Sequence, residues 1–93
     1  MNLATPIVVE GLRMEIMDGE TVLYEDSSKK MIYLNESATV VFQLCDGQRT
    51  VREIIELLAS AYPEVSGSIG HDVLTLIDYL VQECVVRLEA PAQ

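Results

Sequence analysis

The hydrophobic pattern of this chain changes its period near the middle, and this change limits the folds that the chain can adopt. Between Leu12 and Met17, apolar side chains alternate with Arg13 and Glu15, which is the period of a strand. From Ala38 onward, apolar side chains recur at every third or fourth residue, which is the period of an amphipathic helix. A run of strands followed by a run of helices predicts an α+β domain.

The first half is predicted to form a three-stranded antiparallel β-meander. Asp18-Gly19 supplies the first turn, because these residue types tolerate positive φ. Residues 21–24 are β-branched, apolar and aromatic, and residues 30–34 are mostly apolar, so each segment suits a strand. A polar turn at residues 25–28 joins them.

The second half is predicted to form three helices. The first helix is capped by Asn35 and ends at Gly47, a candidate C′ residue. The second begins with the capping box 50–53 and is stopped by Pro63. After a Gly/Ser loop at 65–68, the third runs from residue 68 or 69 to about Glu83, and residues 85–88 could add a short final strand. The expected architecture is winged-helix-like.

One domain is expected, spanning residues 11–89. Residues 1–10 are expected to be a flexible N-terminal arm, and residues 90–93 a frayed C-terminal tail. The first ten residues lack a basic n-region and an apolar h-region, and no apolar run is long enough for a membrane span. Cys45 and Cys84, without an export signal, predict free thiols in the cytoplasm.

The charge of the chain argues against nucleic acid and anionic membranes as partners. Fifteen acidic residues against six basic ones give a net charge of −9, whereas binding to phosphates requires Lys or Arg. Many winged-helix domains bind DNA, but residues 68–83, the predicted third helix, contain neither Lys nor Arg.

No pattern of catalytic or metal-binding residues is found. His71, Cys45 and Cys84 come from different elements and lack the spacing of a zinc site, so no metal is expected. No Lys, Arg or His adjoins Cys84, and His71, the one candidate base for a cysteine nucleophile, has no visible orienting partner; the phosphate-binding and nucleophile-elbow motifs are absent. We therefore expect a protein that is not an enzyme and has no cofactor.

Two features of the sequence could bind a partner: the edge of the third predicted strand and the wide apolar face of the third helix. The strand lies at the sheet edge, where Lys29 and Lys30 guard only its start, so an extended peptide could pair with it. The apolar arc of the third helix covers roughly 160°, wider than the stripe of a surface helix. The edge comprises Lys29, Lys30, Met31, Ile32, Tyr33 and Leu34, and the apolar arc of the helix includes Val73, Leu74, Ile77 and Val81. Two alternatives remain open: the helix could be wedged between two halves of the core, or the first helix or a dimer partner could cover the edge.

Several segments resemble the PqqD family, the stand-alone form of the RiPP precursor-peptide recognition element. They are Leu34-Asn35-Glu36-Ser37-Ala38, Leu44-Cys45-Asp46-Gly47, Thr50-Val51-Arg52-Glu53-Ile54-Ile55, and Ile69 and Asp72-Val73 leading to Leu80. The likeness covers about residues 11–88. The chain departs from the family pattern at Cys84, where members often carry Gly.

The resemblance implies a winged-helix-like fold that binds the leader segment of a ribosomally made precursor peptide. In the family, the leader adds as a strand beside the third strand of the meander, in the groove between that strand and the third helix. On this sequence, the resemblance implies that the binding residues are Lys29 to Leu34 and the helix face from Val73 to Val81, with Leu74 and Ile77. The resemblance implies a modifying enzyme as the partner, commonly a radical SAM maturase and alternatively a leader peptidase, to which the domain presents the peptide. The alternatives are a protein–protein adaptor without a precursor peptide and an accessory subunit of a maturase complex.

Overall fold

The computed structural model describes residues 3–26 and 29–90. Strands β2 (Leu12–Met17), β3 (Glu20–Glu25) and β4 (Lys30–Leu34) form an antiparallel sheet in the order β2-β3-β4. Helices α1 (Glu36–Gln43), α2 (Val51–Ala61) and α3 (Ser66–Gln82) follow, with a single 3₁₀ turn η1 (Pro63–Val65) between the last two. The predicted α+β arrangement of a meander and three helices is confirmed.

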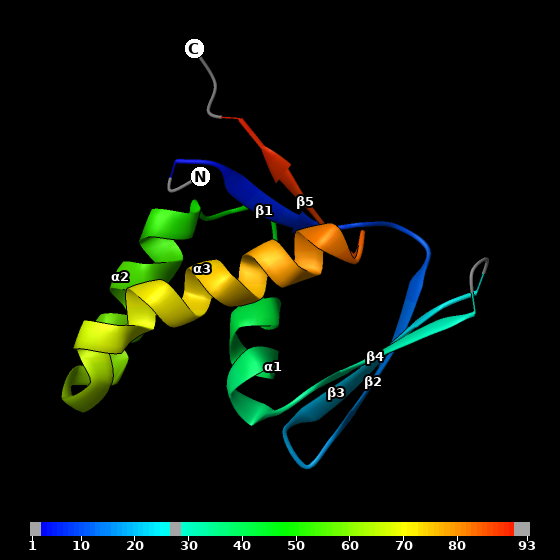
Figure 1. The fold of residues 1–93 in the computed structure, drawn as a ribbon, viewed down its shortest axis with the longest axis horizontal. Helices are drawn as coiled ribbons and strands as arrows, with labels where there is room; N and C mark the ends of the chain where they lie inside the picture. The colour runs from blue at the N-terminus through cyan, green and yellow to red at the C-terminus, as the bar shows by residue number, and fades with distance from the viewer. Residues whose placement is uncertain (1–2, 27–28, 91–93) are drawn as a thin grey trace.

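A second sheet of two strands joins the two ends of the described chain. Strand β1 (Thr5–Val8) pairs antiparallel with β5 (Val86–Glu89), and Figure 1 shows this pair on the side of α3 opposite α1. The prediction of a flexible arm is therefore wrong for residues 5–8. Three interactions hold them: the pairing with β5, a hydrogen bond from the Gly47 N–H to the Pro6 carbonyl, and one from the Val51 N–H to the Ala4 carbonyl. Residues 1–2, 27–28 and 91–93, where parts of the arm, turn and tail were expected, lie outside the described residues.

One hydrophobic core lies between the meander and the helices. Its buried apolar side chains are Leu23, Ile32, Leu34, Val41, Phe42, Cys45, Val51, Ile54, Leu58, Ile69, Val73, Ile77, Leu80, Val85 and Val86. They come from both halves of the sequence, because β4 leads directly into α1 and α3 lies across α1 (Figure 1). The apolar side chains of the strands and those of the helices thus pack in the same core.

The predicted caps of α1 and α2 are present, but α1 is shorter than expected. Asn35 accepts a hydrogen bond from the Ala38 N–H through its side-chain oxygen (2.8 Å), and Thr50 and Glu53 form a reciprocal capping box. Helix α1 ends at Gln43 with Leu44 as C-cap, so Gly47 is not its C′ residue. Gly47 instead adopts φ +80° in the following loop, where a side chain would meet Ile7 at 3.2 Å.

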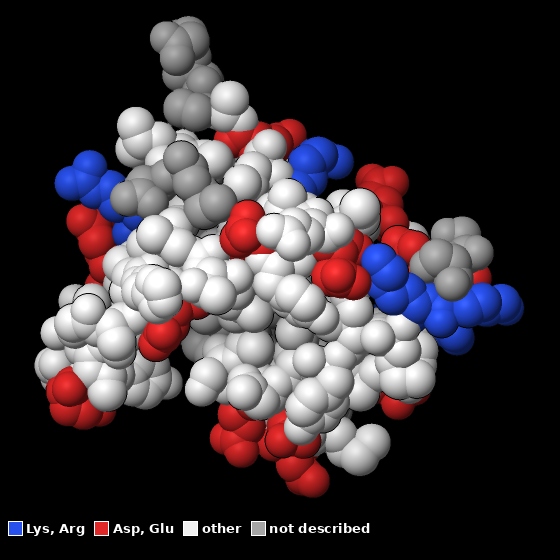
Figure 2. All heavy atoms as spheres, in the orientation of Figure 1, with Lys and Arg blue, Asp and Glu red and all other residues white. Residues whose placement is uncertain are grey.

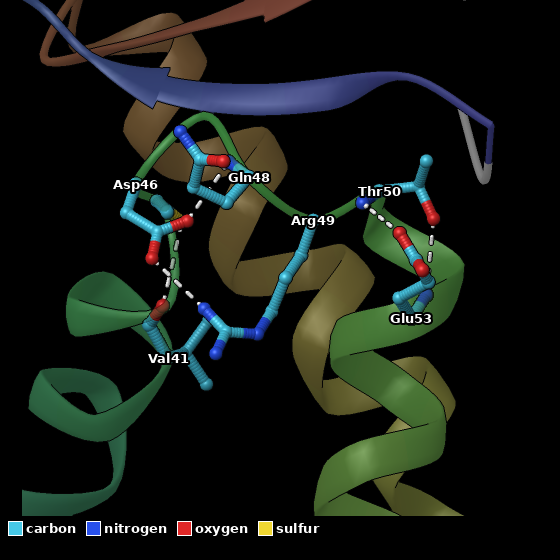
Figure 3. A network of polar contacts seen from close by, with 7 residues as sticks. Val41, Asp46, Gln48, Arg49, Thr50 and Glu53 are labelled. Atoms are coloured by element: carbon cyan, nitrogen blue, oxygen red, sulfur yellow. Dashed lines mark hydrogen bonds and ion pairs between the residues drawn. The ribbon is translucent and has the colours of Figure 1, made fainter.

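The α1–α2 loop is stabilised by the carboxylate of Asp46. One of its oxygens accepts the Gln48 N–H at 2.9 Å and the other pairs with Arg49 Nη1 at 2.8 Å (Figure 3). The backbone N–H of Gln48, with the Arg49 charge as a lesser cause, lowers the pKa of Asp46. The loop therefore has a defined geometry between its two helices.

Helix α3 begins two residues earlier than predicted and ends in a Schellman motif. Because η1 leads into it without a break, Ser66, expected in a loop, is already helical. At its other end, the Cys84 N–H donates to the Val81 carbonyl and the Val85 N–H to the Leu80 carbonyl. In the described part of the chain, no helix is long and apolar enough to cross a membrane.

Candidate functional site

Strand β4 forms one edge of the meander, as predicted. It pairs with β3 on one side, and no other described strand pairs with its outer side. Ile32 and Leu34 point into the core, while Met31 and Tyr33 are 65% and 59% exposed. The outer edge of β4 can therefore accept the backbone of an extended segment.

The start of β4 contacts the end of α3. Lys30 Nζ lies 3.3 Å from Glu83 Oε1 and 3.4 Å from the Glu83 backbone oxygen, and both side chains are about one-third exposed. Residue 83 is the C-cap of α3. This contact shows which side of α3 is turned toward β4.

The two flanks of α3 face different neighbours. At roughly 100° per residue, Leu76 and Asp72 lie on the same flank as Glu83, the residue that contacts Lys30 of β4. Gly70 lies on the opposite flank, where a Cβ added at this residue would be 3.9 Å from Cγ2 of Ile55 in α2. Between the two flanks lies the buried face of Ile69, Val73, Ile77 and Leu80.

The candidate residues on α3 are therefore divided between these faces. Val73 and Ile77 are buried on the face between the two flanks, and Leu74 and Val81 are half-buried on the Gly70 flank. The sequence did not single out Leu76 and Asp72, because the apolar arc extends to both sides of the buried face. The Lys30–Glu83 contact distinguishes the flanks, and it is not visible in the sequence.

A hollow of about 490 Å³ begins where β4 ends. It lies between the start of α1, the end of α2, η1 and the first half of α3, and Figure 2 shows a notch in the molecular outline beside α1. Its lining residues are Asn35, Glu36, Ser37, Ala38, Val40, Val41, Leu58, Tyr62, Val65, Ile69, Asp72, Val73 and Leu76. Asn35 directly follows Leu34, so the hollow begins where β4 ends; we call the β4 edge and the hollow together the β4–α3 groove.

Acidic groups surround the end of β4. A hydrogen bond with the Glu20 carboxylate raises the pKa of the exposed Tyr33 hydroxyl, with smaller contributions from desolvation and from the charges of Glu20 and Glu36. The hydroxyl therefore remains protonated and can donate. The start of the same strand carries Lys29 and Lys30, so the two ends of β4 differ in charge.

The sequence of this chain matches a known protein family. The family model for coenzyme PQQ synthesis protein D (PqqD) matches residues 20–86. The chain belongs to the PqqD family. A PqqA binding protein from Rahnella aquatilis is 39% identical over 72 residues, which cover 74% of this chain and 72% of that protein. One from Pseudomonas paraeruginosa (strain DSM 24068 / PA7) is 33% identical over 89 residues, covering 92% of each chain.

A solved structure has the same fold as this PqqD family member. Lasso peptide synthetase B1, complexed with the leader peptide, superposes with a TM-score of 0.77 over 90% of this chain and 99% of its own. The sequence identity is 18%, so the likeness concerns the fold. The resemblance that the sequence indicated is confirmed.

The family-like segment from Cys45 to Thr50 lies in the α1–α2 loop of this PqqD chain and does not line the groove. Its polar side chains form the Asp46 contacts and the capping box of α2 (Figure 3). The segment Asn35 to Ala38, in contrast, caps α1 and lines the hollow. Cys84, where members often carry Gly, has φ +64°, a conformation that favours Gly.

The two thiols of this PqqD chain are free and differ in their surroundings. Burial, with a lesser contribution from Asp46, raises the pKa of Cys45 to about 12, and its Sγ donates to the Val41 carbonyl. Cys84 is exposed, and so is His71 on α3. Across residues 3–26 and 29–90, no group of three or more His, Cys, Asp or Glu side chains is placed to hold a metal ion.

Proposed function

We propose that this chain binds the leader segment of a PqqA-like precursor peptide by strand addition to β4 and presents it to a modifying enzyme. The observation that carries the proposal is the open outer edge of β4 beside the Glu83 flank of α3. Relatives that share up to 40% of the aligned residues are PqqA binding proteins, and the matching solved structure holds a leader peptide. The protein acts by binding and has no catalytic step of its own in this proposal.

The proposed contact surface includes Lys29, strand β4 (Lys30 to Leu34) and Val73 of α3, and it adds Leu76 and Asp72 from the Glu83 flank. The backbone of the leader pairs with β4, which tolerates many sequences. Alternate side chains of the added strand then point into the β4–α3 groove or away from it, and the former determine selectivity.

Binding in this groove requires apolar anchors. Ordering each leader residue costs about 1–2 kcal/mol of backbone entropy. Two or three buried apolar side chains, each contributing about 1.5–3 kcal/mol, must together with the backbone hydrogen bonds exceed this cost. The expected dissociation constant is about micromolar.

The modifying enzyme in the proposal is a radical SAM maturase, with a leader peptidase as the other candidate. By holding the leader, the domain raises the local concentration of the substrate peptide at the active site of its partner. We place this function in the cytoplasm, since a reducing compartment keeps Cys45 and Cys84 as free thiols.

NMR titration of synthetic Rahnella aquatilis PqqA into ¹⁵N-labelled protein tests the proposal. We expect the shifted amides to cluster in residues 29–34 and on the Glu83 flank of α3. A matched pair of variants, Leu76→Glu and Leu74→Glu, separates the two flanks, because both side chains are half-buried. Leu76→Glu should weaken binding about tenfold or more, or about 1.4 kcal/mol, whereas Leu74→Glu should leave the affinity of the folded protein unchanged.

Two results would overturn the proposal. One is an absence of amide shifts with the PqqA peptide at concentrations well above micromolar. The other is a set of shifts confined to β2 and α2, with β4 and α3 unaffected.

A further inference from the structure

The hollow at the end of β4 has an apolar floor and an acidic rim. Val41, Leu58, Ile69 and Val73 are buried at its floor, and Leu76 stands half-buried at its wall. The volume of the hollow is about 490 Å³, which is enough for a large side chain. Such a floor favours an apolar side chain.

Two carboxylates line this hollow from opposite elements. Glu36 is in the first turn of α1 and Asp72 is on α3, and both are exposed. No Lys or Arg is among the lining residues, and neither carboxylate has an ion-pair partner among residues 3–26 and 29–90. Neither charge is neutralised by a nearby cation of the described chain.

The wider charge distribution also makes this end of the sheet negative. Figure 2 shows basic side chains near the β3–β4 turn and acidic ones at the opposite end of the sheet, over the β2–β3 turn and the start of α1. Glu20 and Glu36 both act on Tyr33, so their negative potential extends to the last residues of β4. A cation that arrives at this end is attracted, and an anion is repelled.

We infer that the hollow binds an apolar side chain of the leader together with an adjacent Lys or Arg, whose cation lies between Glu36 and Asp72. This inference rests on the proposed function and names the class of leader segment that the site selects. The aliphatic stem of Lys or Arg can lie along the apolar wall while its charged end stays in water at the rim. The charges then contribute specificity, and the apolar side chain contributes most of the affinity.

Capped dipeptides test this inference without a leader. The probes are acetyl-Leu-Lys-amide, acetyl-Leu-Gln-amide and acetyl-Leu-Glu-amide, titrated at millimolar concentrations into ¹⁵N-labelled protein. We expect shifts at the amides of residues 35–41 and 69–76, with affinity decreasing from the Lys to the Gln to the Glu probe. Equal affinities for the Lys and Glu probes, or no shifts at these amides with any probe, would overturn the inference.

Variants of the rim provide a second test with a matched control. Glu36→Gln/Asp72→Asn and Glu10→Gln/Glu15→Gln each remove two negative charges from exposed positions, but only the first pair lines the hollow. The rim variant should lose about three- to tenfold in affinity for the Lys probe and become less sensitive to salt. The control should keep at least half of the wild-type affinity, and equal losses in both variants would contradict a local role for the rim.

The proposed function and this inference fail in different ways. Binding of the PqqA peptide along β4 with no preference among the dipeptides retains the function and refutes the acidic-rim selectivity. A Lys preference at the hollow, with no binding of PqqA, supports the selectivity and refutes PqqA as the ligand.

Discussion

Single side chains in this protein connect elements that the sequence separates widely, and the buried threonine pair is the clearest case. Thr21 Oγ1 of β3 and Thr39 Oγ1 of α1 are 2.9 Å apart, and Thr39 also donates to the Leu34 carbonyl at 3.4 Å. Both threonines are buried. The pair orients α1 on the meander, and therefore sets the position of one wall of the hollow.

Replacing one threonine of this pair should destabilise the fold more than replacing both. Thr39→Val leaves the Thr21 hydroxyl buried without its partner, which should lower the free energy of unfolding by about 1–3 kcal/mol. Thr21→Val/Thr39→Val removes both hydroxyls at nearly constant shape and should recover part of this loss. Urea denaturation of the two variants measures the difference, and a double variant less stable than Thr39→Val would contradict the pairing.

Cys84 occupies a backbone conformation better suited to glycine. Its φ of +64° is part of the Schellman motif that ends α3, and its side chain is exposed. We expect Cys84→Gly to raise the free energy of unfolding by up to about 1 kcal/mol, because the left-handed strain is relieved. Cys84→Ser keeps the strain and should leave the stability unchanged. Its affinity for PqqA should stay within about threefold of that of the wild type. Thermal melts of the two variants provide the comparison.

Buried Cys45 predicts a loss of stability at alkaline pH. Its pKa is about 12 in the folded protein and 9.0 for an unperturbed thiol, so the unfolded chain releases the proton first. Ionisation of Cys45 therefore does not affect the free energy of unfolding below pH 9. It lowers this free energy by about 1.4 kcal/mol per pH unit as the pH rises from 9 toward 12. Denaturation at pH 8 and at pH 10.5 should show this loss in the wild type, and a smaller loss in Cys45→Ala, which lacks the buried thiol.

At the scale of elements, the sequence was informative where the pattern is local. The strands of the meander follow from alternation around the Asp18-Gly19 turn, and the starts of α1 and α2 follow from caps within four residues. Strand β1 was missed because its partner is far along the chain: Thr5 pairs with Glu89. The start of α3 was also missed, because Val65 provides no side-chain cap to mark it.

The candidate site was only partly predictable for the same reason. The β4 edge follows from the order of consecutive strands, which hairpin turns dictate. The orientation of α3 depends instead on tertiary contacts, with Ile55 on one flank and Lys30 on the other. Leu74 and Leu76 are equally apolar in the sequence, so only the fold distinguishes the flank that faces β4.

The capping box of α2 should contribute to stability and not to peptide binding. Thr50 accepts the Glu53 N–H at 3.1 Å and donates its own N–H to Glu53 Oε1 at 2.8 Å, away from the hollow (Figure 3). Thr50→Ala should cost about 1 kcal/mol of unfolding free energy, with Ser60→Ala near the end of the same helix as a control that costs little. The affinity of the folded Thr50→Ala protein for PqqA should match that of the wild type. A loss of affinity without a loss of stability would place the loop in the binding surface.

At the scale of the whole molecule, charge separates this protein from DNA-binding domains of similar shape. The three helices and the meander form a winged-helix-like arrangement (Figure 1), and α3 is the helix that would have to enter the major groove if the domain bound DNA. Its sequence from Ser66 to Gln82 contains no Lys or Arg, however, and the net charge is −9. The same negative field that favours a cationic leader segment opposes a phosphate backbone.

We therefore expect no DNA binding at physiological salt. Each phosphate contact gains its free energy from counterions released by Lys or Arg, and the six basic residues of this chain are outnumbered by fifteen acidic ones. A gel-shift assay with a mixed-sequence duplex should show no complex at submicromolar protein. Lowering the salt should not produce one, because weaker screening also strengthens the repulsion from the acidic residues. A specific, salt-sensitive shift would contradict this interpretation of α3 and would require a basic surface that its sequence does not supply.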